Sequence, residues 1–203
     1  MQSLLLDFPT IMTTQTEPVI IVSGLPRSGT SMMMSMLVAG GIPAMTDTIR
    51  TADEDNPKGY FELEKVKELA RDNHWLGETP GRAVKIISAL LKHLPSDYRY
   101  KIIFMRRNMH EILASQRQML IRRGEATDAV SDERMAEMFR KHLAEVEGWL
   151  AKQPNIEVIY VNYNQMLDAP AEPVEAVNDF LGGQLNTAAM RAVVDKTLHR
   201  QRA

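Results

Sequence analysis

The stretch from residue 18 to residue 37 constrains the fold more than any other part of the chain. Residues 19–22 (VIIV) form a short β-branched run, which is typical of a parallel strand that is covered on both faces. Gly24 and Gly29 then enclose four residues, which is the spacing of a loop that binds a phosphate. An apolar helix is expected to begin near Thr30, where its positive N-terminal end favours an anion. The segment therefore predicts a strand, an anion-binding loop and a helix.

The loop departs from the pattern of the nucleotide triphosphatases. In that pattern Lys and then Ser or Thr follow the second glycine, whereas Thr30 and Ser31 follow it here. A cation lies inside the loop instead, at Arg27, whose planar guanidinium can contact two anionic oxygens at once. The alternative is an ordinary turn between strand and helix, with glycines for backbone geometry and hydroxyl residues for capping.

Apolar strands and helical patterns alternate along the rest of the chain. The helix over residues 31–39 is followed by two glycines, which are a helix stop signal. The alternation predicts an α/β fold, a three-layer parallel sheet with helices on both faces, and the glycine spacing of the loop indicates the P-loop type. Further strands are expected over residues 42–45, 82–87, 100–105 and 156–161, and further helices over residues 60–75, 109–122, 132–152 and 171–181.

Length and charge limit the classes of partner. The 203 residues fit a single domain, with residues 1–17 as a loosely held lead-in. Lys plus Arg number 24 and Asp plus Glu number 26, so we expect no nucleic-acid or membrane partner, and any basic site must be local. The chain has no cysteine, which excludes disulfides, thiolate metal sites and cysteine nucleophiles, and fits a cytoplasmic protein. A homodimer is left open.

Residues 26–31 (PRSGTS) resemble the phosphosulfate-binding loop of the sulfotransferases that use 3′-phosphoadenosine 5′-phosphosulfate (PAPS). The common form of that loop is Pro, Lys or Arg, Ser, Gly, Thr, and then Thr or Ser. The resemblance implies that PAPS is the co-substrate and that adenosine 3′,5′-bisphosphate (PAP) is its product. It also implies that the loop binds PAPS through Pro26, Arg27, Ser28, Gly29, Thr30 and Ser31.

A second motif begins at Arg107, at the end of a predicted strand. Residues 107–115 (RNMHEILAS) resemble the segment Arg-Asn-Pro-x-Asp-x-x-x-Ser of the same family, whose Arg and Ser hold the 3′-phosphate of PAPS. Arg107 and Ser115 are eight residues apart, as in the family, whereas Met109 and Glu111 replace its Pro and Asp. An arginine fork beside a hydroxyl donor suits a phosphate. The alternative is that Arg107 is a surface charge and Ser115 a small residue at a helix contact. It is disfavoured because both motifs occur together and in the family's order.

Two further positions are assigned from the resemblance. Residues 158–167 resemble the family's last strand followed by Tyr-Glu-Asp-Leu, which implies that Tyr163 lies near the adenine; packing in the core is an equal alternative. The family's C-terminal Arg-Lys-Gly, which clamps the 3′-phosphate, is missing here, and Arg200 and Arg202 are the candidates to replace it. Met32 stands where an aromatic residue often stacks on the adenine.

The reaction class indicates which groups catalysis needs. Sulfuryl transfer resembles phosphoryl transfer, because an acceptor oxygen attacks in line while negative charge grows on the leaving phosphate oxygen. We expect Arg27 and Lys85 to neutralise that charge without a metal. Ile87 stands where small-molecule sulfotransferases carry a catalytic histidine, so the general base must come from elsewhere. The candidates, each of which is also explained as a solvated charge, are Glu62, Asp47 with the acidic residues that follow it, and His74.

The sequence therefore predicts an enzyme that transfers a sulfuryl group from PAPS to a hydroxyl or amine of a small-molecule or carbohydrate acceptor. One alternative is an ATP-dependent small-molecule kinase with a degenerate loop, against which the missing loop lysine and the Arg107 and Ser115 pair argue. The other is a non-catalytic protein that binds 3′-phosphonucleotides, which the missing histidine keeps open.

Overall fold

The computed structural model describes residues 17–47, 59–127 and 130–198. Four strands form one parallel sheet in the order β2-β1-β3-β4. This architecture confirms the predicted α/β class, because a parallel connection needs a crossover that returns over a face of the sheet. The strands are β1 (Val19–Gly24), β2 (Ala83–Lys85), β3 (Tyr100–Arg106) and β4 (Ile156–Asn162).

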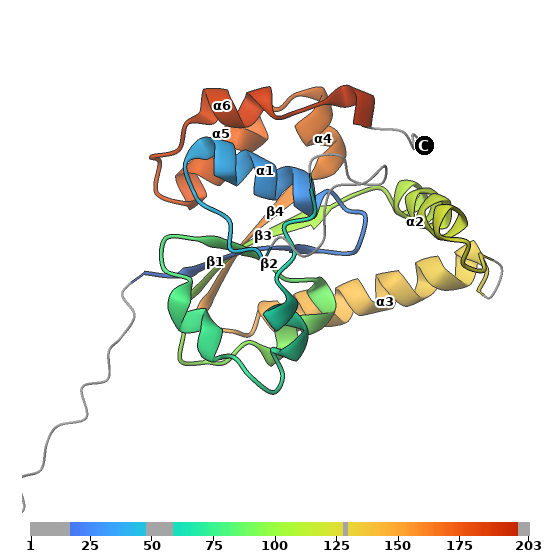
Figure 1. Ribbon diagram of the computed structural model, residues 1–203, viewed down its shortest axis with the longest axis horizontal. Coiled ribbons are helices and arrows are strands. Elements are labelled where there is room, and N and C mark those ends of the chain that lie inside the picture. The colour runs from blue at the N-terminus through green and yellow to red at the C-terminus, as the bar shows by residue number, and fades with distance from the viewer. Residues whose placement is uncertain (1–16, 48–58, 128–129, 199–203) are drawn as a thin grey trace, which may run out of the picture.

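The two faces of the sheet bury separate apolar clusters, because successive residues of a strand point to opposite sides. Ile21 belongs to one cluster and Val22 to the other, and Ile102 and Ile103 of β3 divide in the same way. Figure 1 shows the helices grouped in two layers about the sheet, as predicted. One layer holds α1 (Thr30–Gly40), α4 (Tyr163–Asp168), α5 (Ala171–Phe180) and α6 (Thr187–Ala192); the other holds α3 (Asp132–Leu150) and the 3₁₀ turns η1 (Glu64–Glu68), η2 (His74–Glu78) and η3 (Ser88–His93).

Helix boundaries follow local signals where those signals are strong. Gly41 ends α1 in the left-handed conformation, as its two-glycine sequence predicts. The Asn108 side chain accepts a hydrogen bond from the backbone N–H of His110 and starts α2 (Met109–Arg123). Ser131 caps α3 in the same way through the N–H of Arg134. The predicted helices over residues 109–122, 132–152 and 171–181 are thus confirmed within a few residues.

The predicted helix over residues 60–75 is wrong. The chain forms only the short turns η1 and η2 there, and Phe61 has a φ of +51°, which an α-helix does not allow. The reason is tertiary: the carbonyl of Tyr60 accepts a hydrogen bond from Lys85, and that of Glu62 accepts one from Thr46 Oγ1 at 2.8 Å. Both carbonyls would have to bond within the segment if it were a helix.

The predicted strand over residues 42–45 is also wrong, since only an isolated bridge joins Ala44 to Ala83. Pro43 has no backbone N–H and cannot donate to a ladder. The short helices α4 and α6 were not predicted. Residues 1–16, most of the acidic segment after Asp47, and Arg200 and Arg202 lie outside the described residues. Within the described part of the chain, no helix is long and apolar enough to cross a membrane.

Candidate active site

The loop between β1 and α1 has the tight backbone that its glycines predict. Gly24 and Gly29 have φ values of +146° and +97°, and Arg27 between them has a φ of +69°. A Cβ atom on Gly29 would lie 2.3 Å from Cδ2 of Tyr163, so a side chain there has no room. The loop therefore packs directly against the ring of Tyr163, which follows β4, the second strand from β1 in the sheet.

The N-terminus of α1 opens onto the region enclosed by this loop. Among the described residues no side chain caps the helix, and its first residues Thr30 and Ser31 line a cavity. Uncapped N–H groups and the helix dipole together favour a bound anion. An anionic ligand in the cavity would therefore meet partial positive charge from the backbone alone.

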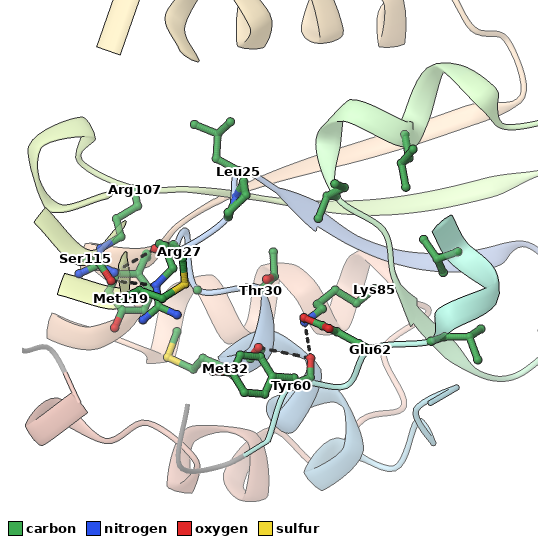
Figure 2. A pocket seen from close by; sticks show the side chains of 18 of the residues that line it. Leu25, Arg27, Thr30, Met32, Tyr60, Glu62, Lys85, Arg107, Ser115 and Met119 are labelled. Atoms are coloured by element: carbon green, nitrogen blue, oxygen red, sulfur yellow. Dashed lines mark hydrogen bonds and ion pairs between the residues drawn. The ribbon is translucent and has the colours of Figure 1, made fainter. Parts of the chain in front are cut away.

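The cavity has a volume of about 470 Å³ and lies at the carboxyl ends of all four strands. Leu25 follows β1, Lys85 ends β2, Arg107 follows β3 and Tyr163 follows β4, and all four residues line it. Open parallel sheets bind ligands at this edge, where loops from several strands meet. Figure 2 shows Arg27, Arg107 and Ser115 on one side of Thr30, and Glu62 and Lys85 on the other side. We call the first group, together with the Tyr163 ring that Arg107 contacts, the arginine end. The lysine end consists of Tyr60, Glu62 and Lys85.

At the arginine end the two predicted motifs meet. Nε of Arg27 donates a hydrogen bond to Oγ of Ser115 at 2.9 Å, although the two residues are 88 positions apart in the sequence. Arg107 donates from a terminal nitrogen to the backbone carbonyl of Arg27 at 3.0 Å. The structure thus brings together two guanidinium groups and a hydroxyl, all in the cavity lining. This set of donors suits a phosphate group.

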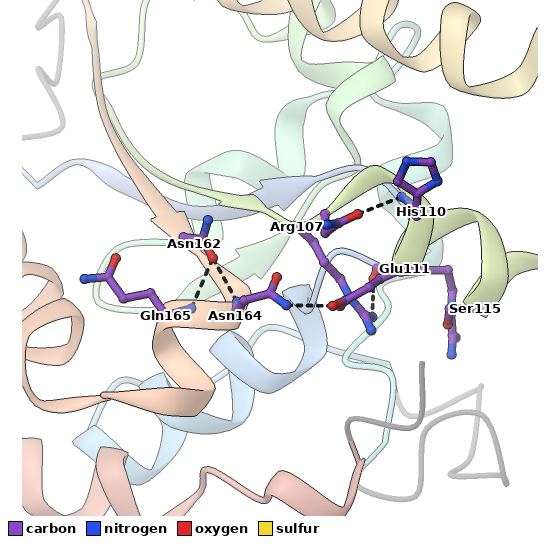
Figure 3. A network of polar contacts seen from close by, with 9 residues as sticks. Arg107, His110, Glu111, Ser115, Asn162, Asn164 and Gln165 are labelled. Carbon is purple, nitrogen blue, oxygen red and sulfur yellow. Dashed lines mark hydrogen bonds and ion pairs between the residues drawn. The ribbon is translucent and has the colours of Figure 1, made fainter. Parts of the chain in front are cut away.

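A buried ion pair fixes the position of Arg107 (Figure 3). Its Nε donates to one oxygen of Glu111 at 2.8 Å, and Nδ2 of Asn164 donates to the other oxygen at 2.8 Å. The side chains of Arg107 and Glu111 are only 8% and 3% exposed. The guanidinium carbon of Arg107 lies 4.4 Å from the ring centroid of Tyr163. Burial raises the pKa of the Tyr163 phenol above its ordinary value, so this ring stays neutral near pH 7.

The lysine end holds a second cation and a carboxylate. Nζ of Lys85 donates to the backbone carbonyl of Tyr60 and lies 3.6 Å from Oε1 of Glu62. The Lys85 side chain is 9% exposed, whereas that of Glu62 is 37% exposed and reaches solvent. An opposed ammonium and carboxylate in a cavity can stabilise an anion and accept a proton, respectively.

The other predicted site residues are distributed unevenly. Pro26 lines the cavity with the rest of the loop, but Ser28 is buried, and its hydroxyl has no hydrogen-bond partner among the described residues. Asp47 accepts a hydrogen bond from the backbone N–H of Glu64 at the start of η1. The described lining of the cavity includes neither Asp47 nor His74. Within the described residues, no group of His, Asp or Glu side chains is arranged to hold a metal ion.

Sequence reasoning missed Glu111, Asn164 and Tyr60 as parts of the site. A signal for Glu111 was present, since it lies four residues after Arg107 on a predicted helix, where opposite charges pair. Nothing local marked the other two, because each contributes to the site through a contact with a distant part of the chain.

Sulfotransferases are among the solved structures similar to this chain. The mouse sulfotransferase SULT7A1, complexed with PAP, aligns with a TM-score of 0.50 and 17% identity, covering 92% of this chain and 66% of its own. Sulfotransferase STF9 from Mycobacterium avium aligns with a TM-score of 0.49 and 17% identity, covering 92% of this chain and 69% of its own. The chain thus spans about two thirds of the length of these structures. Among curated proteins, none matches it.

A family model decides the classification. The model described as a sulfotransferase domain matches residues 17–201, which is nearly the whole chain. The match includes both predicted motifs and every element of the sheet. This chain therefore belongs to the sulfotransferase domain family.

Proposed function

We propose that this protein transfers a sulfuryl group from PAPS to a hydroxyl or amine of an acceptor molecule. One observation carries the proposal: a single cavity joins the uncapped N-terminus of α1 to a cluster of Arg27, Arg107 and Ser115. Both are sites for anions, and PAPS carries anionic groups at its 5′ and 3′ positions. The similar mouse sulfotransferase was solved with PAP, which supports the same donor here.

The two anionic groups of the donor have different partners in this proposal. The loop and the first turn of α1 hold the 5′-phosphate by backbone N–H groups. The arginine end holds the 3′-phosphate, where Ser115 supplies a hydroxyl and Arg27 and Arg107 supply fixed positive charge. The sequence predicts that both Arg27 and Lys85 neutralise the charge on the leaving group. In this proposal Lys85 does most of it, because the Arg27 side chain is hydrogen-bonded to Ser115.

Transfer requires one bond to form and one to break. The acceptor oxygen or nitrogen bonds to sulfur while the bond from sulfur to the bridging phosphate oxygen breaks, and that oxygen keeps the electron pair. In this proposal Lys85 stabilises the developing charge, and Glu62, whose Oε1 lies 3.6 Å from Nζ of Lys85, takes the acceptor's proton. The reaction therefore uses both charged groups of the lysine end.

The experiment that tests the donor compares ligands by thermal unfolding. PAP should stabilise the protein more than AMP, ADP or ATP does. At one hundred times its dissociation constant, PAP should raise the free energy of unfolding by about 2.7 kcal/mol relative to the protein without ligand. Equal stabilisation by ATP and PAP would favour the kinase alternative instead. A turnover assay with PAPS and a mixture of acceptors then separates an enzyme from a protein that only binds the nucleotide.

The variant Ser115→Ala sharpens this test because it leaves the ion pair between Arg107 and Glu111 intact. It should weaken PAP binding by about 1.5–3 kcal/mol, the usual contribution of a hydrogen bond to a charged group, while 5′-AMP binds as before. A loss of the same size for both nucleotides would remove Ser115 from the 3′-phosphate site.

A further inference from the structure

The wall of the cavity beside the lysine end is apolar. We call it the apolar wall; it consists of Leu63, Val66, Ile87 and Leu90. Leu63 follows Glu62 directly, and Ile87 is two residues after Lys85, so the wall belongs to the same two segments as the lysine end. Leu63 and Leu90 also pack against the buried core cluster, which holds the wall in place.

Ile87 is unusual within this wall. Its side chain lines the cavity, and the residue is 44% exposed although it is fully apolar. Its neighbour Ile86 is completely buried, which is the ordinary state for an isoleucine beside a strand. An apolar ligand that covers an exposed apolar side chain removes its surface from water, which favours binding.

The charged groups around the wall already have partners. Lys67 and Glu64, which line the cavity, pair with each other at 2.7 Å and are 66% and 58% exposed. Lys85 contacts the Tyr60 carbonyl and Glu62. A carbohydrate lying on the wall would bury several hydroxyls against carbon, and each hydroxyl that loses its water without gaining a partner weakens binding.

We propose that the acceptor is a neutral alcohol or phenol carried on an apolar skeleton, with the skeleton against the apolar wall and the hydroxyl between Lys85 and Glu62. The proposal rests on the proposed function and narrows its acceptor, which the sequence leaves between small molecules and carbohydrates. The hydroxyl oxygen forms the new bond to sulfur, its proton passes to the Glu62 carboxylate, and PAP leaves with the electron pair of the broken bond.

Acceptor competition tests the proposal on the wild-type protein with PAPS. The probes are 2-naphthol and cyclohexylmethanol on one side, and methyl glucoside and glucosamine on the other, with PAP release and sulfated product as readouts. The apolar alcohols should show a kcat/KM about 10²-fold higher, which is the limited discrimination that an apolar pocket reaches against an added hydroxyl. Equal or faster turnover of the sugars would overturn the inference.

A pair of isoleucine variants locates the effect. Ile87→Ser should raise KM for 2-naphthol roughly tenfold, as expected for the loss of aliphatic contact in a pocket, and should leave PAP affinity unchanged. Ile121→Ser is the matched control, because Ile121 is 54% exposed on α2 and is not among the described lining residues. An unchanged KM in Ile87→Ser, or the same rise in Ile121→Ser, contradicts the wall's role.

The outcomes separate the two proposals. If PAP stabilises the protein but sugars are preferred, or neither class is turned over, the acceptor inference fails while the nucleotide site stands. If PAP gives no stabilisation and PAPS no turnover with any probe, the proposed function fails and takes this inference with it.

Discussion

The two ends of the cavity differ in how firmly their charges are held. At the arginine end, Arg107 and Glu111 are almost fully buried, and both carboxylate oxygens of Glu111 accept a hydrogen bond at 2.8 Å. At the lysine end, Glu62 is 37% exposed and lies 3.6 Å from Lys85, beyond hydrogen-bond distance. A fixed end suits binding of a constant part of the donor. A looser end can form contacts with the transition state that are absent with the bound substrate. Only such contacts accelerate the chemical step.

The largest effect should come from breaking the fixed pair. Arg107→Ala leaves Glu111 buried without its counter-charge, so we expect a loss of about 3–5 kcal/mol in the free energy of unfolding. The matched control is Arg106→Ala, because Arg106 pairs with Glu147 at the same distance of 2.8 Å but with 46% and 32% exposure. That variant should lose about 1 kcal/mol or less. Urea unfolding measures both.

Adding Glu111→Ala to Arg107→Ala provides a second check on the fixed pair. The double variant should recover part of the lost stability, because no uncompensated charge then remains buried. Equal losses in Arg106→Ala and Arg107→Ala, with no recovery in the double variant, would show that the two ends do not differ in the way described.

At the lysine end, substitutions should change the catalytic rate more than the stability or the PAP affinity. Lys85→Ala should lower kcat by about 10²–10³-fold, the size seen when one group that stabilises developing charge is removed. PAP affinity should change much less. Lys67→Ala is the control, since Lys67 lines the same cavity but pairs with Glu64 in solvent, and its kcat should stay within about twofold. Steady-state kinetics with PAPS decides between a change in kcat and one in affinity.

Glu62→Gln tests the proton acceptor and keeps the shape of the side chain. We expect a rate loss of about 10²-fold and the disappearance of the acidic limb of the pH–rate profile, because glutamine cannot take a proton. Glu64→Gln is the neighbouring control and should keep both the rate and the limb. If Glu62→Gln retains the wild-type profile, the base assignment moves to Asp47 or His74.

The smallest effect concerns the pH dependence of stability. Because burial raises the folded-state pKa of Tyr163, the folded state holds this proton more tightly than the unfolded state. The resulting stability is fully present below the ordinary tyrosine pKa of 10.0 and is lost as the pH rises above it. As the pH rises from 8 to above 10, Tyr163→Phe should therefore lose less stability than the wild type. A slope identical to that of the wild type would contradict the burial argument.

Much of the fold was predictable because its signals are local. The glycines around α1, the caps of α2 and α3 and the apolar strands act within a few residues, and the structure contains the elements they predict. Residues 60–75 show the limit. Their helical spacing is real, but bonds from Lys85 and Thr46 to the carbonyls of Tyr60 and Glu62 hold the backbone in another conformation. Local preference is weak enough for such tertiary contacts to override it.

For the site, the sequence by itself determined the chemical groups: a glycine-spaced loop with Arg27, and an arginine and a serine eight residues apart. The tertiary structure alone decided how they combine. It pairs Arg27 with Ser115 across 88 positions, links Glu111 to Asn164 across 53, and separates Arg27 from Lys85 within one cavity. These pairings depend on the strand order β2-β1-β3-β4, which brings the ends of distant segments to one edge. A motif specifies groups and spacing along the chain, whereas hydrogen bonds depend on distances in space.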